Sequence, residues 1–301
     1  MDRTLAAPPA SPVRETVLEP RLHQVQCLGA GGLHRMSYVE WGRADNPRVV
    51  ICVHGLTRNG RDFDFLARAM SRDFRVVCPD VVGRGKSDWL RDKRGYTIEQ
   101  YMADMVTLIA RLDVPSVSWV GTSMGGVIGM ALAGDPATPI TRLVLNDIGP
   151  VITAASIQRI AETLGATPHF ATLDEAEAWI RKVGAPFGRL SDAQWRHLTE
   201  HSVKPGATGF EMRYDPAIRE VFDQLQGEEP VDLWEVYHAV RCPTLAIRGA
   251  LSDLLERPAL EEMARTGPRA RTVEIAGVGH APMLMDEAQI ALVRDFLCEE
   301  D

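Results

Sequence analysis

The sequence predicts an α/β fold in which a mostly parallel, doubly wound sheet is interrupted by a helical insertion. Two observations carry this prediction. Contiguous apolar runs recur along the chain, as is typical of strands buried on both faces of a parallel sheet, and helical patterns lie between most of them. The apolar runs are VVICV (49–53), RVVC (75–78), VSWV (117–120), RLVLN (142–146), PTLAI (243–247) and RTVEI (271–275).

The elements before and between these runs have signals of their own. Residues 21–42 suggest a hairpin across the Gly29–Gly32 turn. The clearest helix is TIEQYMADMVTLIARL, residues 97–112, where Thr97 and Gln100 form a capping-box pattern ahead of apolar residues at helical spacing.

The alternation of strand and helix stops near residue 147 and resumes near residue 242. We therefore expect a core from residues 21–149 and 236–301, with residues 150–235 inserted as a helical cap. This insertion has helical character at 173–183 and 192–203 and contains no convincing strand. Its large side chains are expected to form its own core or to line a pocket: Phe170, Trp179, Trp195, Phe187, Phe210, Tyr214, Phe222 and Trp234.

Composition narrows the class of protein. The 301 residues carry a net charge of −8, which argues against a nucleic-acid or anionic-membrane partner. Residues 1–20 combine four prolines with interspersed charges, so we expect a flexible arm rather than a signal peptide. No uncharged stretch is long enough to span a bilayer. We expect a cytoplasmic protein without membrane insertion, whose partner is a small molecule, and a homodimer stays open.

The cysteines agree with that compartment. Their number is odd, no two have CxxC spacing, and most lie beside apolar runs, so buried and reduced thiols are expected. They are Cys27, Cys52, Cys78, Cys242 and Cys298.

The stretch DVVGRGKSD (80–88) ends like a phosphate-binding loop. Such a loop needs a glycine where this chain has Asp80, and a carboxylate there would repel a phosphate. We therefore expect a tight structural turn after a strand rather than a nucleotide site.

The strongest chemical signal is Gly121-Thr122-Ser123-Met124-Gly125, a G-x-S-x-G sequence that follows an apolar strand and precedes a helix. The serine of this motif lies on a sharp, strained turn, and side chains at the two glycine positions would collide with neighbouring backbone. Ser123 is therefore the predicted nucleophile.

A serine hydroxyl needs a base, and the base needs an acid that orients it. His280 and Asp253 each follow a predicted strand near the C-terminus, in the chain order Ser, Asp, His expected for this motif. We predict Ser123, His280 and Asp253 as the catalytic residues. Asp147, at the end of the preceding strand, is the alternative acid. His54 is the alternative base, but its place in the turn after the first parallel strand favours a role in fixing that loop.

The same turn, VHGLT, is expected to supply part of an oxyanion hole. The backbone N–H groups of Leu56 and Met124 are the predicted donors. The neighbouring Arg58 and Asn59 could meet a substrate carboxylate or simply belong to an exposed polar loop.

Taken in chain order, these motifs resemble the α/β-hydrolase superfamily over nearly the whole chain: HGLTRNG (54–60), DVVGRGKSD (80–88), GTSMGG (121–126), RGALSD (248–253) and GHAP (279–282). Within it, the chain looks like bacterial carboxylesterases and enol-lactonases with a helical cap. The resemblance implies that Asp80, Gly83, Gly85 and Ser87 form a structural D-x-x-G-x-G-x-S turn. The family often has an arginine where this chain has Val82, so an ion pair at that position is not expected here.

A second motif spells a different chemistry. His197-Leu198-Thr199-Glu200-His201 matches the H-x-x-E-H pattern of a zinc protease. A catalytic zinc also needs a third protein ligand, and no partner stands out in the rest of the insertion. We therefore expect these histidines on a solvated helix face, with no metal and no cofactor.

The predicted function is a serine hydrolase that cleaves a carboxylic ester or lactone with an apolar acyl or alcohol part through an acyl-enzyme. Two alternatives stay open. One is hydrolysis of a carbon–carbon bond in a ring-cleavage product by the same residues. The other is a non-catalytic small-molecule receptor with a vestigial triad.

Overall fold

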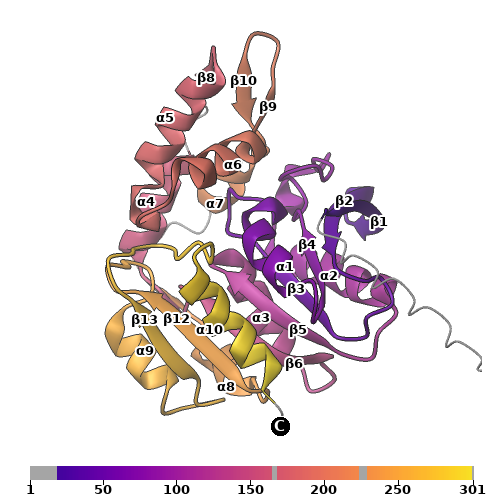
Figure 1. The fold of residues 1–301 in the computed structure, drawn as a ribbon, viewed down its shortest axis with the longest axis vertical. Coiled ribbons are helices and arrows are strands. Elements are labelled where there is room, and N and C mark those ends of the chain that lie inside the picture. The colour runs from indigo at the N-terminus through magenta and orange to yellow at the C-terminus, as the bar shows by residue number, and fades with distance from the viewer. Residues whose placement is uncertain (1–18, 165–167, 224–228, 300–301) are drawn as a thin grey trace, which may run out of the picture.

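The computed structural model describes residues 19–164, 168–223 and 229–299. Its centre is an eight-stranded sheet with the order β1-β2-β4-β3-β5-β6-β12-β13 (Figure 1). Strand β2 is antiparallel to β1 and β4, and the other neighbouring pairs are parallel. The strands are β1 (Arg21–Gly29), β2 (Gly32–Trp41), β3 (Val49–Val53), β4 (Arg75–Pro79), β5 (Val117–Thr122), β6 (Ile140–Asn146), β12 (Thr244–Gly249) and β13 (Arg271–Ile275).

The six apolar runs overlap strands of the sheet, and one of these strands lacks the burial on both faces that we expected. Every residue of β3 and β12 is buried, as in a strand covered on both faces. The run 271–275 is also a strand, but none of its residues is fully buried. The expectation of two-sided burial is wrong for β13 because it lies at the edge of the sheet. The predicted hairpin is confirmed, with Gly29 paired to Gly32.

Helices cover both faces of the sheet. The side chains of α1 (Asp64–Met70) and α10 (Glu287–Cys298) pack into one apolar core on one face. The core on the other face includes side chains of α2 (Ile98–Leu112), α3 (Met124–Ala133), α8 (Trp234–Ala239) and α9 (Arg257–Met263). These three layers are the α/β-hydrolase fold that the sequence predicted.

The start of α2 shows how local sequence sets an element. The Thr97 side chain accepts a hydrogen bond from the backbone N–H of Gln100, as the capping pattern predicted. The Gln100 side chain does not turn back to the cap. It donates instead to the carbonyl of Leu28 and to Asp104, so it ties α2 to the end of β1.

Much of the insertion, residues 150–235, lies in the upper part of Figure 1, whereas Trp234 near its end begins α8 at the bottom of the view. Its helices are α4 (Ala154–Leu164), α5 (Leu173–Val183), α6 (Asp192–Ser202) and α7 (Ile218–Asp223), and both predicted helices are present. The expectation of no strand in it is wrong, because strands of two or three residues pair locally, too short to leave an apolar run. They are β7 (Val151–Ile152), β8 (His169–Phe170), β9 (Val203–Pro205), β10 (Phe210–Met212) and β11 (Val231–Asp232).

The insertion has its own apolar core, which includes Phe170, Ile180, Trp195 and Leu198. Trp179 and Phe187 pack against this core from its partly buried rim. Trp234 instead packs against the core on the face of the sheet that α2, α3, α8 and α9 cover. The large side chains are therefore divided among two cores and, as described below, the pocket. The side chain of Phe222 lies outside the described residues.

The loop after β4 is the structural turn that the sequence predicted. Asp80 accepts hydrogen bonds from the backbone N–H groups of Gly60 (2.8 Å) and Lys86 (2.7 Å). The Ser87 hydroxyl donates to the Asp80 carbonyl at 2.5 Å. Burial raises the pKa of Asp80 to about 6 despite these donors. The carboxylate is thus used to close the loop and join it to Gly60, in a position where a phosphate loop would need a glycine.

Three cysteines are buried free thiols as predicted, namely Cys27, Cys52 and Cys78. Cys242 is half-buried, and Cys298 near the end of α10 is exposed, so the expectation of burial fails there. Among the described residues, no helix is both long and apolar enough to cross a membrane. The arm predicted for residues 1–20 lies outside the described residues except for its last two positions.

Candidate active site

Ser123 lies at the sharp turn between β5 and α3, at φ 53°. The close approach of neighbouring backbone explains both glycines of the motif. A Cβ on Gly121 would lie 2.3 Å from the carbonyl oxygen of Gly125, and one on Gly125 would lie 2.0 Å from that of Val53. Neither contact is sterically allowed, so the strained turn that presents the Ser123 hydroxyl depends on these two glycines.

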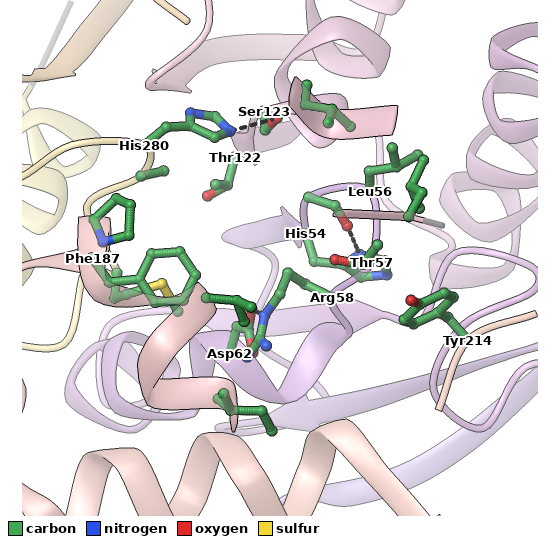
Figure 2. Close-up of a pocket in the computed structure, with 18 of the residues that line it drawn as sticks. His54, Leu56, Thr57, Arg58, Asp62, Thr122, Ser123, Phe187, Tyr214 and His280 are labelled. Carbon is green, nitrogen blue, oxygen red and sulfur yellow. Dashed lines mark hydrogen bonds and ion pairs between the residues drawn. The ribbon is translucent and has the colours of Figure 1, made fainter. Parts of the chain in front are cut away.

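Three side chains distant in sequence form one continuous chain of hydrogen bonds. His280 Nε2 lies 3.0 Å from Ser123 Oγ, a contact drawn in Figure 2. On the other side of the ring, His280 Nδ1 lies 2.7 Å from Asp147 Oδ2. Ser123 follows β5, Asp147 follows β6, and His280 follows β13. The carboxyl ends of parallel strands meet at one edge of the sheet, which is why these residues converge.

Asp147 is fully buried, and donors surround its carboxylate. Its Oδ1 accepts from the backbone N–H of Gly249 at 2.7 Å, and its Oδ2 accepts from the hydroxyl of Ser252 at 2.6 Å as well as facing His280. These donors fix the carboxylate against the imidazole. An acid in this position holds one tautomer of the histidine and stabilises its protonated form.

The prediction of Asp253 as the partner of His280 is therefore wrong. The Asp253 side chain is 53% exposed and forms an ion pair with Arg159 of α4. The residue of the turn after β12 that contacts Asp147 is Ser252, which directly precedes Asp253. The alternative acid, Asp147, occupies the site. The sequence could not separate the two because both aspartates follow a strand of the sheet.

His54 fixes the loop after β3, as expected from its position. The Val81 N–H donates to His54 Nε2 at 2.9 Å, so Nδ1 carries the proton and donates to the Gly55 carbonyl at 2.7 Å. Burial lowers the pKa of His54 to about 3, and the ring stays neutral. A histidine with both nitrogens bound to backbone groups is no base for Ser123.

Arg84 is a residue of the site that the sequence did not reveal. Its side chain is fully buried, and its Nε donates to the Leu56 carbonyl at 2.8 Å. A second nitrogen lies 3.7 Å from Met124 Sδ, and a third donates to Val82 and Tyr101. It thereby joins the two residues predicted to supply the oxyanion donors. An arginine between two turn glycines has no sequence signal that would predict this.

A cavity of about 180 Å³ opens beside Ser123 and His280. The core contributes Leu56, Thr57, Arg58 and Met283 to its lining, and the insertion contributes Arg159, Ile160, Leu164, Trp179, Val183, Phe187, Met212 and Tyr214. Figure 2 shows Phe187 on the His280 side and Tyr214 on the Leu56 side. Several of the large residues of the insertion thus line the pocket, while others form its core. The lining is mostly apolar with a few polar groups, as in small-molecule sites.

The two residues considered for a substrate carboxylate differ in the structure. The Arg58 guanidinium lines the cavity but donates to both oxygens of Asp62, at 2.7 and 2.6 Å, and to Ser202 at 3.0 Å. Asn59 is buried and caps the turn at Gly60–Phe63 (η1), where it also donates to the His201 carbonyl. Asn59 is therefore structural rather than an exposed loop residue.

Comparison with known proteins places this site in a family. A model of the alpha/beta hydrolase family matches residues 50–293. The chain is 48% identical over 285 residues to a 3-hydroxybutyrate-oligomer hydrolase from Cupriavidus necator, covering 92% of this chain and 97% of that protein. It is 28% identical over 244 residues to esterase YbfF from Escherichia coli, covering 78% and 87%.

A crystal structure agrees with these relatives. An alpha/beta hydrolase from Novosphingobium aromaticivorans aligns with a TM-score of 0.82 at 31% identity, covering 92% of this chain and 98% of that one. The chain belongs to the alpha/beta hydrolase family, as the resemblance predicted. It is an ester-hydrolysing enzyme.

Proposed function

We propose that this enzyme hydrolyses short oligoesters of 3-hydroxybutyrate, with Ser123 as nucleophile, His280 as base and Asp147 as acid. The observation that carries the proposal is the unbroken series of contacts from Ser123 Oγ through the His280 ring to the Asp147 carboxylate. The substrate class is supported by the 48% identity, over most of both chains, to a protein named for oligomers of 3-hydroxybutyrate.

The geometry supports an acyl-enzyme mechanism. His280 Nε2 accepts the Ser123 proton as Oγ attacks the ester carbonyl, and the N–H groups of Leu56 and Met124 stabilise the oxyanion. The protonated His280 then gives its proton to the leaving alcohol. In the second half, water attacks the acyl group of Ser123 with His280 again as base. Asp147 orients the His280 ring and stabilises the imidazolium in both halves.

Arg159 is the proposed recognition group for the free carboxylate at the end of such an oligoester. It lies in the lining of the cavity, and its Asp253 partner is 53% exposed, where ion pairs are weak and easily rearranged. Arg159 and Arg58 are each held through two contacts by an aspartate, but the Arg58–Asp62 pair is largely buried, with side chains 16% and 9% exposed. Arg159 belongs to α4 of the insertion, so we propose that the insertion acts as a lid that carries a specificity residue.

The test compares the linear dimer and trimer of 3-hydroxybutyrate with their methyl esters, using wild type, Ser123→Ala and Arg159→Gln. We expect Ser123→Ala to lower turnover of every substrate by about 10⁴-fold or more. Arg159→Gln should raise KM for the free acids about tenfold and leave the methyl esters unchanged, because only the free acids present a carboxylate. Arg189→Gln, an exposed change in the same insertion, is the matched control.

A panel of para-nitrophenyl esters from two to twelve carbons separates the parts of the proposal. Turnover of these esters that disappears in Ser123→Ala, without turnover of the oligoesters, would retain the nucleophile and refute the substrate. Turnover of a vinylogous diketone alone would favour the carbon–carbon hydrolase. Equal loss on free acids and methyl esters in Arg159→Gln would refute the role of the arginine.

A further inference from the structure

The two histidines of the H-x-x-E-H pattern lie beside the carboxylate of Asp64, a residue that is distant from them in the sequence. His197 and His201 lie one turn apart on α6, with ring centroids 4.5 Å apart. Asp64, the first residue of α1, lies against them from the core. Asp64 belongs to the core and lies more than a hundred positions earlier in the chain than the two histidines.

The spacing of the three groups suits a metal ion. One ring nitrogen of each histidine and one carboxylate oxygen of Asp64 lie within 4.8 Å of one another. His197 Nε2 is 3.4 Å from Asp64 Oδ2. Two ligands at zinc–ligand distances of 2.0–2.1 Å in a tetrahedron lie about 3.3 Å apart. This pair is therefore already at the separation of one edge of a tetrahedral site.

We propose that Asp64, His197 and His201 bind a divalent transition-metal ion, best matched by Zn²⁺, that joins α6 of the insertion to α1 of the core. Two imidazoles and one carboxylate are ligands that zinc accepts, whereas Mg²⁺ and Ca²⁺ prefer oxygen ligands alone. Water completes the tetrahedron. None of the three residues lines the cavity beside Ser123, so the ion is a structural and regulatory link and takes no part in ester cleavage.

Arg61 gives the site a built-in competitor. Its guanidinium Nε donates to Asp64 Oδ2 at 2.7 Å, and so it neutralises the carboxylate when no metal is bound. Its backbone carbonyl lies 3.0 Å from His197 Nε2. Binding of zinc through Nε2 requires the ring proton of His197 to sit on Nδ1, and it places a dication beside the guanidinium. Both requirements weaken zinc binding. The repulsion between the dication and the guanidinium is removed by the substitution Arg61→Gln.

A metal ion bound here would stabilise the interface between the insertion and the core. The Ser202 side chain of α6 accepts from Arg58, and the His201 carbonyl accepts from Asn59. Both partners lie in the loop after β3 that also carries Leu56. A metal bridge beside these bonds would hold α6 more firmly against that loop. We expect bound zinc to raise the melting temperature and to slow turnover where release of product requires the insertion to move.

The experiment measures binding of Zn²⁺ alone to the chelator-treated full chain by isothermal titration calorimetry, with melting temperature as a second readout. Wild type should bind one ion per chain and melt at a higher temperature with zinc. His201→Gln and His197→Gln should each weaken binding at least about 100-fold, since even the loss of a group that only hydrogen-bonds to a metal ligand costs about 10–100-fold. Arg61→Gln should tighten binding, on the order of tenfold, because a neighbouring cation is removed.

Two controls separate this site from other histidines. His169→Gln removes an exposed histidine of the same insertion and should leave zinc affinity unchanged. His280→Gln removes the imidazole beside Ser123 and should also retain one ion. Loss of binding in His280→Gln with retention in His201→Gln would overturn the proposal. So would wild type that binds no stoichiometric zinc, or binding that Arg61→Gln weakens, provided that the variant melts as wild type without metal.

Discussion

At the scale of single residues, the site depends on which aspartate meets the imidazole. Asp147 has a left-handed φ of 54°, which turns the chain at the end of β6 and points its carboxylate into a ring of donors. Those donors come from His280, Gly249 and Ser252. Asp253, which follows β12 rather than β6, faces solvent and Arg159 instead.

Replacing each aspartate separately tests this assignment. Asp147→Asn should lower kcat on a short para-nitrophenyl ester by about 10⁴-fold, because an amide in that place favours the wrong tautomer of His280. Asp253→Asn should change kcat by less than about threefold, as expected for a residue in an exposed ion pair. An active Asp147→Asn enzyme, with unfolding curves matching wild type for both variants, would contradict the assignment.

At the scale of elements, the loop between β4 and the Lys93–Gly95 turn (η2) shows a carboxylate used as a structural clamp. Asp80 is buried, it accepts from two backbone N–H groups, and burial still raises its pKa to about 6 from 3.8. Because the pKa in the folded state lies above that of the unfolded chain, the folded state binds the proton more tightly. This contribution to stability is complete below about pH 4 and is lost as pH rises through about 6.

We therefore expect the stability difference between wild type and Asp80→Asn to depend on pH. From about pH 4 to about pH 7, the free energy of unfolding of wild type should fall relative to the variant by about 2 kcal/mol. Urea unfolding of both proteins at the two pH values measures this. The substitution also disturbs one backbone contact, but that cost is the same at both pH values. A difference independent of pH would show that Asp80 is ionised in the folded state throughout this range.

Elements were predictable from sequence where a local pattern decides the structure. The buried runs, the Thr97 cap and the G-x-S-x-G turn each depend on residues close together in the chain. The features that the sequence did not predict depend on contacts between residues far apart in the chain. Arg84 reaches Leu56 and Met124 from another loop, and the strands β8, β9 and β10 pair only because the chain between them folds back. Such contacts are products of tertiary packing and leave no periodicity to read.

At the scale of the whole molecule, the pocket belongs to two parts of the chain. The core supplies Ser123 and His280, and the insertion supplies much of the apolar lining. Its volume of about 180 Å³ lies below the ~300 Å³ at the lower end of typical ligand pockets. We therefore expect the acyl group of the substrate to be short.

Chain-length preference should follow from this division. Wild type is expected to favour para-nitrophenyl butyrate over the octanoate. Phe187→Ala should shift the optimum to longer chains, because Phe187 lines the cavity and packs only on the partly buried rim of the insertion's core. The kcat/KM ratio of octanoate to butyrate measures the shift, with about tenfold expected from the area uncovered. An unchanged ratio would show that the acyl chain lies along another wall.

The core of the insertion also contains Met283 and Met285, which follow His280 in the chain. These two methionines anchor the loop that carries the imidazole to Phe170, Trp195 and Leu198. A chimaera that exchanges residues 150–235 for the cap of a relative would therefore leave this loop against a foreign surface. Transfer of substrate preference between relatives should succeed only when residues 281–286 are grafted together with the cap.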